Sequence, residues 1–346
     1  MLENEIYINE DNLVYNYQYY KNKTNKNIIA ILKSNAYGHG LIPVAKILDS
    51  LNVYMIAVST IQEGINLRQH NIKTQILILE PIEVKDMLNC YYYHLTPVIS
   101  SLYQFNKLSK AKFFSSLPIH LKIDSGMHRL GVNKEEAIII KEKLNIYSNL
   151  KLSGIFTHLI GSEKEEGFIN KQIKYFEEII DIFDDTSLSL HVSSSSSLDI
   201  DSSKTNTVRI GLGLYGLKDP NNTKQVLSLS SPIINIRHIQ KDEYASYNNS
   251  FKAPNDGYIY TIPLGYQSGI LLKYKIKPTI DNKPLLVAGN KCMNQTLLFS
   301  KNQYFIGEMI SIIDEKNTLL DLSKRSNVSI YELICLLNQN IKRIVI

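Results

Sequence analysis

Residues 27–40 read NIIAILKSNAYGHG, an apolar run that ends in a lysine and a glycine-containing turn. The run is short and rich in β-branched residues, which predicts a buried strand rather than a helix. Lys33 then lies at the mouth of the strand, where partial desolvation favours the neutral amine, a nucleophile that can form a Schiff base with a carbonyl. Gly38 and Gly40 allow a tight turn and a close approach of backbone to a ligand. Taken alone, these residues favour a lysine that extends to solvent from a strand end, followed by an ordinary turn, so a role for Lys33 depends on the residues that the rest of the chain brings to it.

The composition is that of a globular protein with room for two domains. The chain has 346 residues, of which 44% are hydrophobic and 21% charged. The formal net charge is +5, but lysines and arginines are scattered singly, so no nucleic-acid partner is indicated. The N-terminus is acidic and no run of about 18 apolar residues occurs, so we expect neither a signal peptide nor a membrane span.

Cysteine usage points to a reducing compartment. Cys90, Cys292 and Cys335 are odd in number, far apart and without a CxxC pair. This pattern indicates neither a disulfide framework nor a zinc site, and we expect no metal. A cytoplasmic location fits these observations.

Eight short apolar runs recur in the first part of the chain, with amphipathic segments between them. The runs are residues 28–33, 54–59, 75–79, 95–99, 118–124, 151–158, 188–193 and 207–212. Strands that alternate with helices also occur in doubly wound sheets, but a count of eight in about 220 residues favours a (β/α)8 barrel. We therefore predict that residues 1–225 form such a barrel.

The sequence changes character after Pro220. No long helical period follows, and turn-forming Asn, Asp, Gly and Pro residues separate short strand-like runs. These runs are residues 233–239, 258–264, 270–276, 285–288, 296–299 and 309–313. We predict that residues 226–346 form a second, mostly β domain.

Polar side chains follow the predicted barrel strands at their carboxyl ends, where barrel enzymes build their active sites. Singly, each could be a core histidine, a linker serine or a surface ion pair. Together they favour a phosphate-bearing cofactor with a carbonyl that meets Lys33, and pyridoxal 5'-phosphate has both features. The residues are Lys33, Asp124, Met127, Arg129, His158, His191, serines 193–197, Arg209, Gly211 and Leu212.

These motifs resemble those of the alanine racemase family. Members of that family are pyridoxal-phosphate enzymes with an N-terminal barrel and a C-terminal β domain. The matching segments follow the family's order along nearly the whole chain. They are residues 32–40, 122–131, 156–158, 208–211, 246–247, 263–266, 292–293 and 331–332, with His191. The resemblance implies an isomerase that interconverts L- and D-alanine and supplies D-alanine for peptidoglycan. It also implies a homodimer whose subunits share the active sites.

The resemblance also implies a two-base mechanism. Lys33 would hold the cofactor and act as one acid/base, and Tyr247 of the partner subunit would act as the other. Two bases are needed because the α-proton leaves one face of the carbon and returns to the opposite face. Arg209 would face the pyridine nitrogen and, because arginine keeps its proton, leave that nitrogen unprotonated. His158 would link Arg209 to the region of Tyr247.

Further roles carry over by position. The substrate carboxylate would be held by Arg129 and the Met293 backbone N–H, and Tyr266 would keep the pocket small. Lys122 matches a lysine that is carbamylated in some members of the family. The remaining cofactor contacts, mainly to the phosphate, would come from Tyr37, Ser194, Ser195, Gly211, Leu212 and Tyr331.

The chain departs from the family at several positions. Ser194 replaces an asparagine, Asn294 an aspartate, and Asn290 and Leu272 two arginines that line the access channel, whereas an acidic residue is kept as Glu163. Losing two positive charges makes a channel less repulsive to cationic amino acids. Alanine is the expected substrate. A racemase for serine or a basic amino acid remains open, as does a non-catalytic relic that only binds the cofactor.

Overall fold

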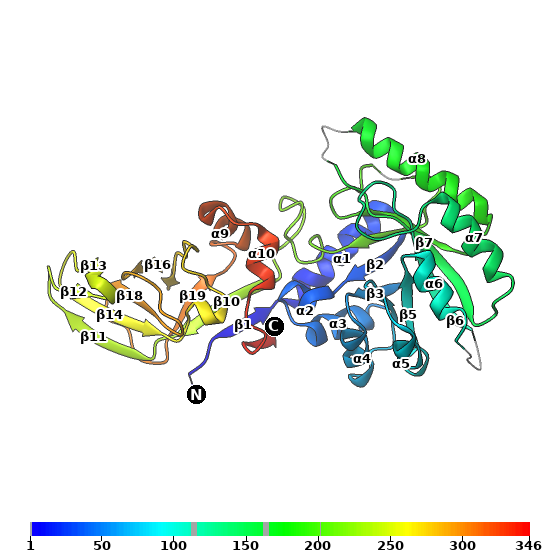
Figure 1. The fold of residues 1–346 in the computed structure, drawn as a ribbon. Coiled ribbons are helices and arrows are strands. Elements are labelled where there is room, and N and C mark those ends of the chain that lie inside the picture. Colours follow the sequence, from blue (N-terminus) through cyan, green and yellow to red (C-terminus); the bar gives the residue numbers. More distant parts are fainter. Residues whose placement is uncertain (1, 112–115, 162–165, 201) are drawn as a thin grey trace. The chain divides into compact units, whose positions relative to one another are not determined.

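The structure, a computed structural model, describes residues 2–111, 116–161, 166–200 and 202–346 (Figure 1). The chain divides into two compact units. The β unit comprises Met1–Asn16, Asn35–Pro43 and Tyr215–Ile346, and the barrel unit comprises Tyr17–Ser34 and Val44–Leu214. The predicted domain boundary between residues 225 and 226 stays a prediction.

The barrel unit contains a closed barrel of eight parallel strands. Its last strand pairs with its first, with Asn27 opposite Thr207 and Ala30 opposite Ile210. The strands are β2 (Asn27–Ile31), β3 (Met55–Val58), β4 (Gln75–Ile78), β5 (Leu95–Ile99), β6 (Leu117–Lys122), β7 (Leu150–Phe156), β8 (Ser189–Ser194) and β9 (Thr207–Ile210). Burial on both faces explains the nearly continuous apolar runs, since every residue of β3 and β5 is buried.

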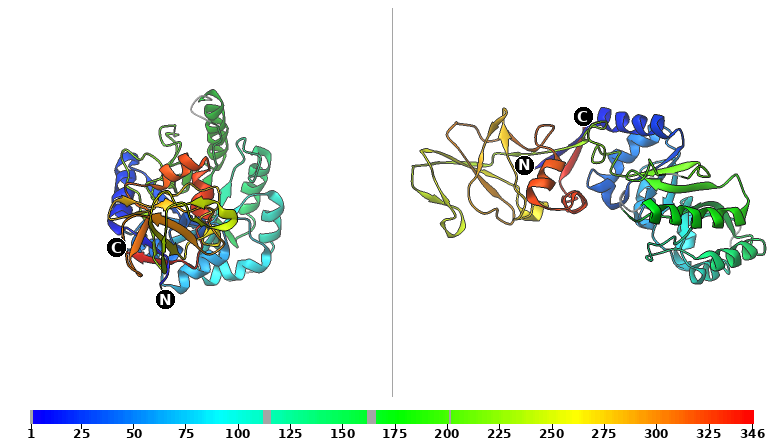
Figure 2. Two further views of the ribbon diagram at one scale, coloured as in Figure 1. Left: turned by 90° about the vertical axis from the view of Figure 1, so that its left-hand side faces the viewer. Right: turned by 90° about the horizontal axis from the view of Figure 1, so that it is seen from above.

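Helices lie outside the strands of the barrel (Figures 1 and 2). Local capping fixes where several of them begin: Thr60 accepts a hydrogen bond from Glu63 N at 3.2 Å, and Asn133 accepts one from Glu136 N at 2.8 Å. The helices are α1 (Glu10–Thr24), α3 (Leu41–Ser50), α4 (Ile61–Gln69), η1 (Val84–Asp86), α5 (Met87–Tyr92), α6 (Leu102–Leu108), α7 (Lys134–Leu144) and α8 (Glu166–Phe183).

The β unit is built on two larger sheets and a short hairpin. The six-stranded sheet has the order β16-β15-β19-β10-β1-β20, the four-stranded sheet the order β11-β14-β18-β17, and β12 pairs with β13. The elements of this unit are β1 (Glu5–Ile8), β10 (Leu227–Pro232), β11 (Asn235–Ile239), β12 (Tyr244–Ala245), η3 (Tyr247–Asn249), β13 (Phe251–Lys252), β14 (Gly257–Ile262), η4 (Tyr266–Ser268), β15 (Thr279–Ile280), β16 (Lys283–Pro284), β17 (Leu286–Val287), β18 (Thr296–Ser300), β19 (Met309–Ile313), α9 (Leu319–Ser326), α10 (Ile330–Cys335) and β20 (Lys342–Val345). The predicted fold class, a (β/α)8 barrel followed by a mostly β region, is confirmed.

Two details of the β unit differ from the prediction. Strand β1, which the sequence did not reveal, lies between β10 and β20, with Ile6 and Ile8 fully buried. The predicted strand at residues 270–276 is wrong: the segment is irregular, and Tyr274 N donates to Leu271 O at 3.0 Å within a turn. Ile270, Tyr274 and Ile276 are buried, but the carbonyls of Leu272 and Tyr274 accept hydrogen bonds from a lysine side chain instead of a neighbouring strand.

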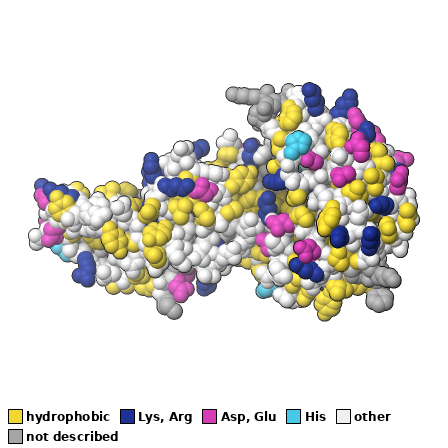
Figure 3. All heavy atoms as spheres, viewed as in Figure 1, with side chains coloured by type: hydrophobic (Ala, Val, Ile, Leu, Met, Phe, Trp, Pro, Cys, Tyr) yellow, Lys and Arg dark blue, Asp and Glu magenta, His cyan; other side chains and the backbone are white. Residues whose placement is uncertain are grey.

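The surface carries charges of both signs. On the face drawn in Figure 3, dark blue cationic and magenta acidic side chains are interspersed. Among the residues that the structure describes, no helix is long and apolar enough to cross a membrane. Within the same residues, no group of three or more His, Cys, Asp or Glu side chains is placed to hold a metal ion.

Candidate active site

Basic side chains gather at the carboxyl ends of the barrel strands. Lys122, at the end of β6, is buried, and its pKa is lowered to about 8 by burial and then by the positive charges of Arg129, Arg209 and Lys33, despite the opposing effect of Asp124. Cations that repel one another in a partly buried site are stabilised when an anion joins them. The barrel mouth therefore favours an anionic ligand.

Arg209, on β9, has a fixed position among backbone carbonyls. Its Nη1 donates to the carbonyl oxygen of His191 at 3.0 Å, and its Nη2 donates to those of Thr157 and Val192, both at 2.8 Å. The guanidinium also lies 5.3 Å from the ring centroid of Phe156, and the side chain is only 5% exposed. A guanidinium held in this way stays charged and keeps its orientation.

His158 follows β7 and lies within the same electrostatic environment. Burial and the nearby charges of Arg209, Lys122, Arg129 and Lys33 lower its pKa to about 3. The imidazole is therefore neutral at neutral pH and can both donate and accept a hydrogen bond. Its predicted link between Arg209 and the tyrosine base stays a prediction, and Glu163 lies outside the described residues.

A tight loop after β6 presents Arg129. Asp124 Oδ1 accepts hydrogen bonds from Gly126 N and His128 N, both at 3.0 Å, which closes the turn. Gly131 has a φ of +136°, and a Cβ there would lie 2.4 Å from Asp124 N, so the turn requires glycine. Arg129 itself is exposed at the rim, where it can meet a carboxylate.

The loops after β8 and β9 carry several residues that the sequence predicts to contact a phosphate. Ser195 Oγ accepts hydrogen bonds from Gly211 N at 3.0 Å and Gly213 N at 3.3 Å, which leaves the serine hydrogen to donate to a ligand. A Cβ on Gly213 would lie 2.5 Å from the ring of Tyr20, so the close approach depends on glycine. The serine and glycine residues expected of a phosphate site are thus together, although the N–H groups of Gly211 and Gly213 are both directed to the serine.

Ser194, the position at which the family has asparagine, ends β8 beside Arg209. The two residues are register partners. The backbone N–H of Ser194 donates to Ser197 Oγ at 2.9 Å, and Leu212 next to the phosphate loop is buried. A serine hydroxyl reaches less far than an asparagine amide, so a ligand contact made by the amide would be lost or replaced in this chain.

The turn after Lys33 has an unusual backbone. Four consecutive non-glycine residues, Ser34 to Tyr37, have φ between +52° and +55°, the left-handed region, in the element α2 (Lys33–Tyr37). Each such residue costs roughly 1–2 kcal/mol, so surrounding contacts must hold the turn. In the β unit, His39 N donates to Ala36 O at 3.0 Å and Gly40 N donates to Asn35 O at 2.9 Å. Strain of this kind is typical of residues that position a functional group.

Gly38 offers a test of how this turn is held. A Cβ on Gly38 would lie 2.1 Å from the carbonyl oxygen of Ile334, and its φ is +79°. We expect Gly38→Ala to lower the free energy of unfolding by about 2–4 kcal/mol, measured by thermal and urea denaturation. Gly167→Ala on α8 is the control: nothing lies within 4 Å of its Cβ, so stability should stay equal or rise slightly. Equal stability of the two variants would contradict the expectation.

Two predicted phosphate ligands, Tyr37 and Tyr331, lie together in the β unit. Their ring centroids are 6.4 Å apart, and Tyr37 also packs on Tyr215 at 5.4 Å. Burial, then the proximity of Tyr331 and Cys335, raises the pKa of Tyr37, so its hydroxyl remains a donor. Tyr331 is 50% exposed and can reach a ligand.

The predicted substrate contacts Tyr266 and Met293 are neighbours. Tyr266 N donates to Cys292 O at 3.2 Å, and Gln267 N donates to Met293 O at 2.9 Å. A Cβ on Gly265 would lie 2.3 Å from Met293 O, which explains the glycine before this tyrosine. The two turns thus hold each other in place.

Tyr247 begins a turn that is exposed. Its side chain is 68% accessible, and it follows Ser246, whose φ is +67°. Ser246 Oγ donates to Asn290 O at 3.3 Å, which ties this turn to the segment that carries the predicted channel residues. Within this chain the Tyr247 side chain therefore projects from the β unit.

The altered channel positions also lie in the β unit. Leu272 is 61% exposed, and Asn290 and Asn294 are exposed. The neighbouring Lys291 is 8% exposed, and its ammonium donates to the carbonyls of Leu272 at 3.0 Å and Tyr274 at 2.8 Å. The cation of this segment is therefore directed into the fold and does not replace the missing arginines.

Two residues of the barrel interior were not assigned a role from the sequence. His191 Nδ1 lies 2.9 Å from Arg209 Nη1, and His191 Nε2 lies 3.0 Å from His120 Nδ1. The His191 ring also stacks on Phe156 with centroids 4.7 Å apart. His120 and Lys122 are two residues apart on β6, and side chains two apart on a strand point to the same side. This spacing was a signal in the sequence that His120 shares the side of the strand on which Lys122 lies.

Comparisons with known proteins agree over the whole chain. The family model for the alanine racemase N-terminal domain matches residues 8–219, and the model for the C-terminal domain matches residues 226–345. An alanine racemase of Borreliella burgdorferi (strain ZS7) is 33% identical over 98% of this chain and 96% of its own length. A lysine racemase of Oenococcus oeni (strain ATCC BAA-331 / PSU-1) is 31% identical over 99% and 97%. The solved structure of an alanine racemase from Clostridium difficile 630 has a TM-score of 0.92 at 26% identity, over 100% and 96% of the two chains.

Proposed function

The chain belongs to the alanine racemase family and is an amino-acid racemase, and from this premise we propose that it interconverts L- and D-alanine with pyridoxal 5'-phosphate, so supplying D-alanine for peptidoglycan. The observation that carries the proposal is the group of cations at the barrel mouth, where Arg129, Arg209 and Lys33 act on Lys122. A phosphorylated cofactor and a substrate carboxylate both need such an environment.

The donor set fits the cofactor. Arg209 is buried and oriented, as a partner for a pyridine nitrogen requires, and Lys33 offers an amine to a carbonyl. Ser195, whose Oγ accepts from the N–H groups of Gly211 and Gly213, has its hydroxyl hydrogen left to donate to a phosphate. We propose that Tyr37, His158, Ser194, Gly211, Leu212 and Tyr331 complete the binding of the cofactor.

The proton transfers are assigned to two side chains. When bound, pyridoxal phosphate withdraws electrons from the substrate Cα and so acidifies its proton. Lys33 Nζ would take or return this proton on one face, and Tyr247 Oη of the partner subunit on the other. The 68% exposure of Tyr247 supports this arrangement, because a side chain that serves another subunit must project from its own. We therefore propose a homodimer with shared active sites.

Substrate binding would rest on few contacts. Arg129, exposed at the barrel rim, would bind the substrate carboxylate together with the Met293 N–H. Tyr266 and Tyr331 would limit the space beside Cα, which favours the methyl group of alanine. Lys122 adds a possible modification: its pKa of about 8 leaves a fraction of neutral amine at neutral pH, the form that reacts with CO2 to give a carbamate.

A basic amino acid is the second candidate substrate. Exposed Leu272 and Asn290 stand where the family has arginines, and the ammonium of Lys291 is turned onto backbone carbonyls. A channel without those cations repels a cationic substrate less. The 31% identical relative named lysine racemase shows that this family contains a protein named for a basic substrate.

Turnover of an L-amino-acid panel by the purified holoenzyme tests both substrates. We expect kcat/KM to be highest for alanine, with measurable turnover of serine or lysine. Chiral chromatography of the products measures the turnover of each amino acid. Leu272→Arg and Asn290→Arg should lower kcat/KM for lysine by about three- to tenfold and leave alanine unchanged, since like charges repel.

Asn294→Asp serves as a control on the same segment, because it changes the charge beside Met293 without adding a cation. The proposal that the channel admits cationic substrates would be refuted if the enzyme turned over alanine only and both arginine variants had the same kcat/KM values as the wild type. A protein that shows the cofactor's visible absorption but turns over no amino acid would be a binding relic.

A further inference from the structure

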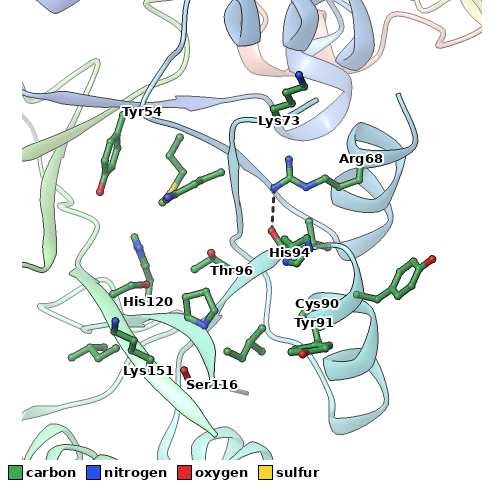
Figure 4. A pocket seen from close by; sticks show the side chains of 18 of the residues that line it. Tyr54, Arg68, Lys73, Cys90, Tyr91, His94, Thr96, Ser116, His120 and Lys151 are labelled. Carbon is green, nitrogen blue, oxygen red and sulfur yellow. Dashed lines mark hydrogen bonds between the residues drawn. The ribbon is translucent and has the colours of Figure 1, made fainter. Parts of the chain in front are cut away.

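A cavity lies at the amino ends of the barrel strands, the end opposite to Lys33. Its volume is about 1190 Å3, and its lining includes Gln75 at the start of β4, Leu95 at the start of β5 and Leu117 at the start of β6 (Figure 4). Ligand pockets in proteins typically measure about 300–1,000 Å3, so the cavity has room for a small organic molecule. None of the residues assigned above to cofactor or substrate lines it.

The charge of the lining is of one sign. Arg68, Lys73 and Lys151 line the cavity, whereas no Asp or Glu does so among the described residues. Arg68 also fixes the shape of the wall, because it donates to the carbonyl of Thr74 at 2.7 Å, just before β4, and to that of His94 at 3.1 Å, just before β5. Figure 4 shows the bond to His94. Asp49, which does not line the cavity, offsets part of the charge of Arg68, so Lys73 and Lys151 supply most of the excess positive charge, and this excess favours an anionic ligand.

A chain of hydrogen bonds determines which atom His120 presents to this cavity. Arg209 Nη1 can only donate, so His191 Nδ1 accepts at 2.9 Å and the proton of His191 lies on Nε2. His191 Nε2 then donates to His120 Nδ1 at 3.0 Å, which places the proton of His120 on Nε2. Burial lowers the pKa of His120 to about 3, in agreement with a neutral ring.

The resulting N–H of His120 lacks a partner. The side chain is fully buried and forms part of the cavity lining, yet Nε2 has no hydrogen-bond partner among the described residues. A buried donor without an acceptor is costly, which makes an acceptor on a ligand favourable. In Figure 4 the hydroxyls of Tyr54 and Thr96 and the ring of His120 point into the same space.

We propose that this cavity binds an anionic small molecule through a carboxylate or phosphate oxygen that accepts a hydrogen bond from His120 Nε2–H and pairs with Lys151. Lys151 supplies charge at the wall, and Tyr54 and Thr96 supply further hydroxyl donors. The two oxygen sources share this chemistry, so one probe of each kind separates them: benzoate for a carboxylate and inorganic phosphate for a phosphate.

Calorimetric titration of the holoenzyme with each probe tests the site. We expect saturable binding of at least one probe, about three- to tenfold weaker in Lys151→Gln because a charged contact is lost. Lys171→Gln is the matched control, since Lys171 is exposed on α8 and does not line the cavity. Its affinity should equal that of the wild type.

A second readout reports on His120 directly. In the holoenzyme labelled with 15N-histidine, the probe that binds should shift the Nε2–H resonance of His120, assigned by its absence from His120→Asn. Absence of saturable binding by both probes, or equal affinity in Lys151→Gln and the wild type, would overturn the proposal. If Arg129→Gln abolishes binding and Lys151→Gln leaves it unchanged, the anion binds at the barrel mouth instead. This result would also overturn the proposal.

Discussion

A Lys33→Ala variant is expected to lose both the visible absorption of the bound cofactor and racemase activity. The amine of Lys33 is the group that would anchor the cofactor and move one proton, so its removal eliminates two functions together. Activity towards L-alanine should fall by about 10³-fold or more, since general acid–base groups alone contribute about 10²–10⁴. Absorption spectra and loss of optical rotation measure the two effects on one sample.

Lys33→Arg separates the nucleophile from the charge. Arginine keeps the positive charge that Lys122 and His158 sense but cannot act as a neutral amine. Both variants should therefore behave alike if the amine matters. A Lys33→Arg protein with wild-type spectrum and turnover would show that only the cation at this position is needed.

The barrel was predictable because its signal is local. Most residues of the barrel strands are buried on both faces, so apolar runs such as residues 28–31 appear in the sequence without knowledge of their neighbours. Strand β1 was not, because its four residues pair with β10 and β20, which lie more than 200 positions away. A short half-buried run carries too little pattern to reveal such a partner.

The identity of the site residues was predictable where a sequence motif marks them. The backbone conformation and the protonation of the site were not, because they depend on contacts in the folded chain. Lys33 and Arg209 stand out through their positions at strand ends. The left-handed turn from Ser34 to Tyr37 does not, because its residues are not glycines and only their surroundings impose the positive φ. The tautomer of His120 likewise follows from Arg209 through His191, a relation between three strands that no linear spacing encodes.

Tyr247→Phe is expected to keep the absorption of the cofactor and to lose interconversion of the two enantiomers. Only the phenolic oxygen is removed, so the ring and its turn at Ser246 remain. Without the second base, a proton taken from one face cannot be returned to the other, and racemisation should fall by about 10²–10⁴. Lys33 would still act on its own face, so one enantiomer should continue to exchange its α-proton with deuterated water, as NMR can follow.

Tyr244→Phe is a close control for this experiment, because Tyr244 lies three residues earlier on β12 and is also exposed, at 58%. It should racemise alanine at the wild-type rate. The informative contrast is between exchange and racemisation: loss of both would mean that Tyr247 is needed to build the site, whereas loss of racemisation alone isolates its proton. Full activity of Tyr247→Phe would exclude the two-base assignment and leave Lys33 as the only assigned base.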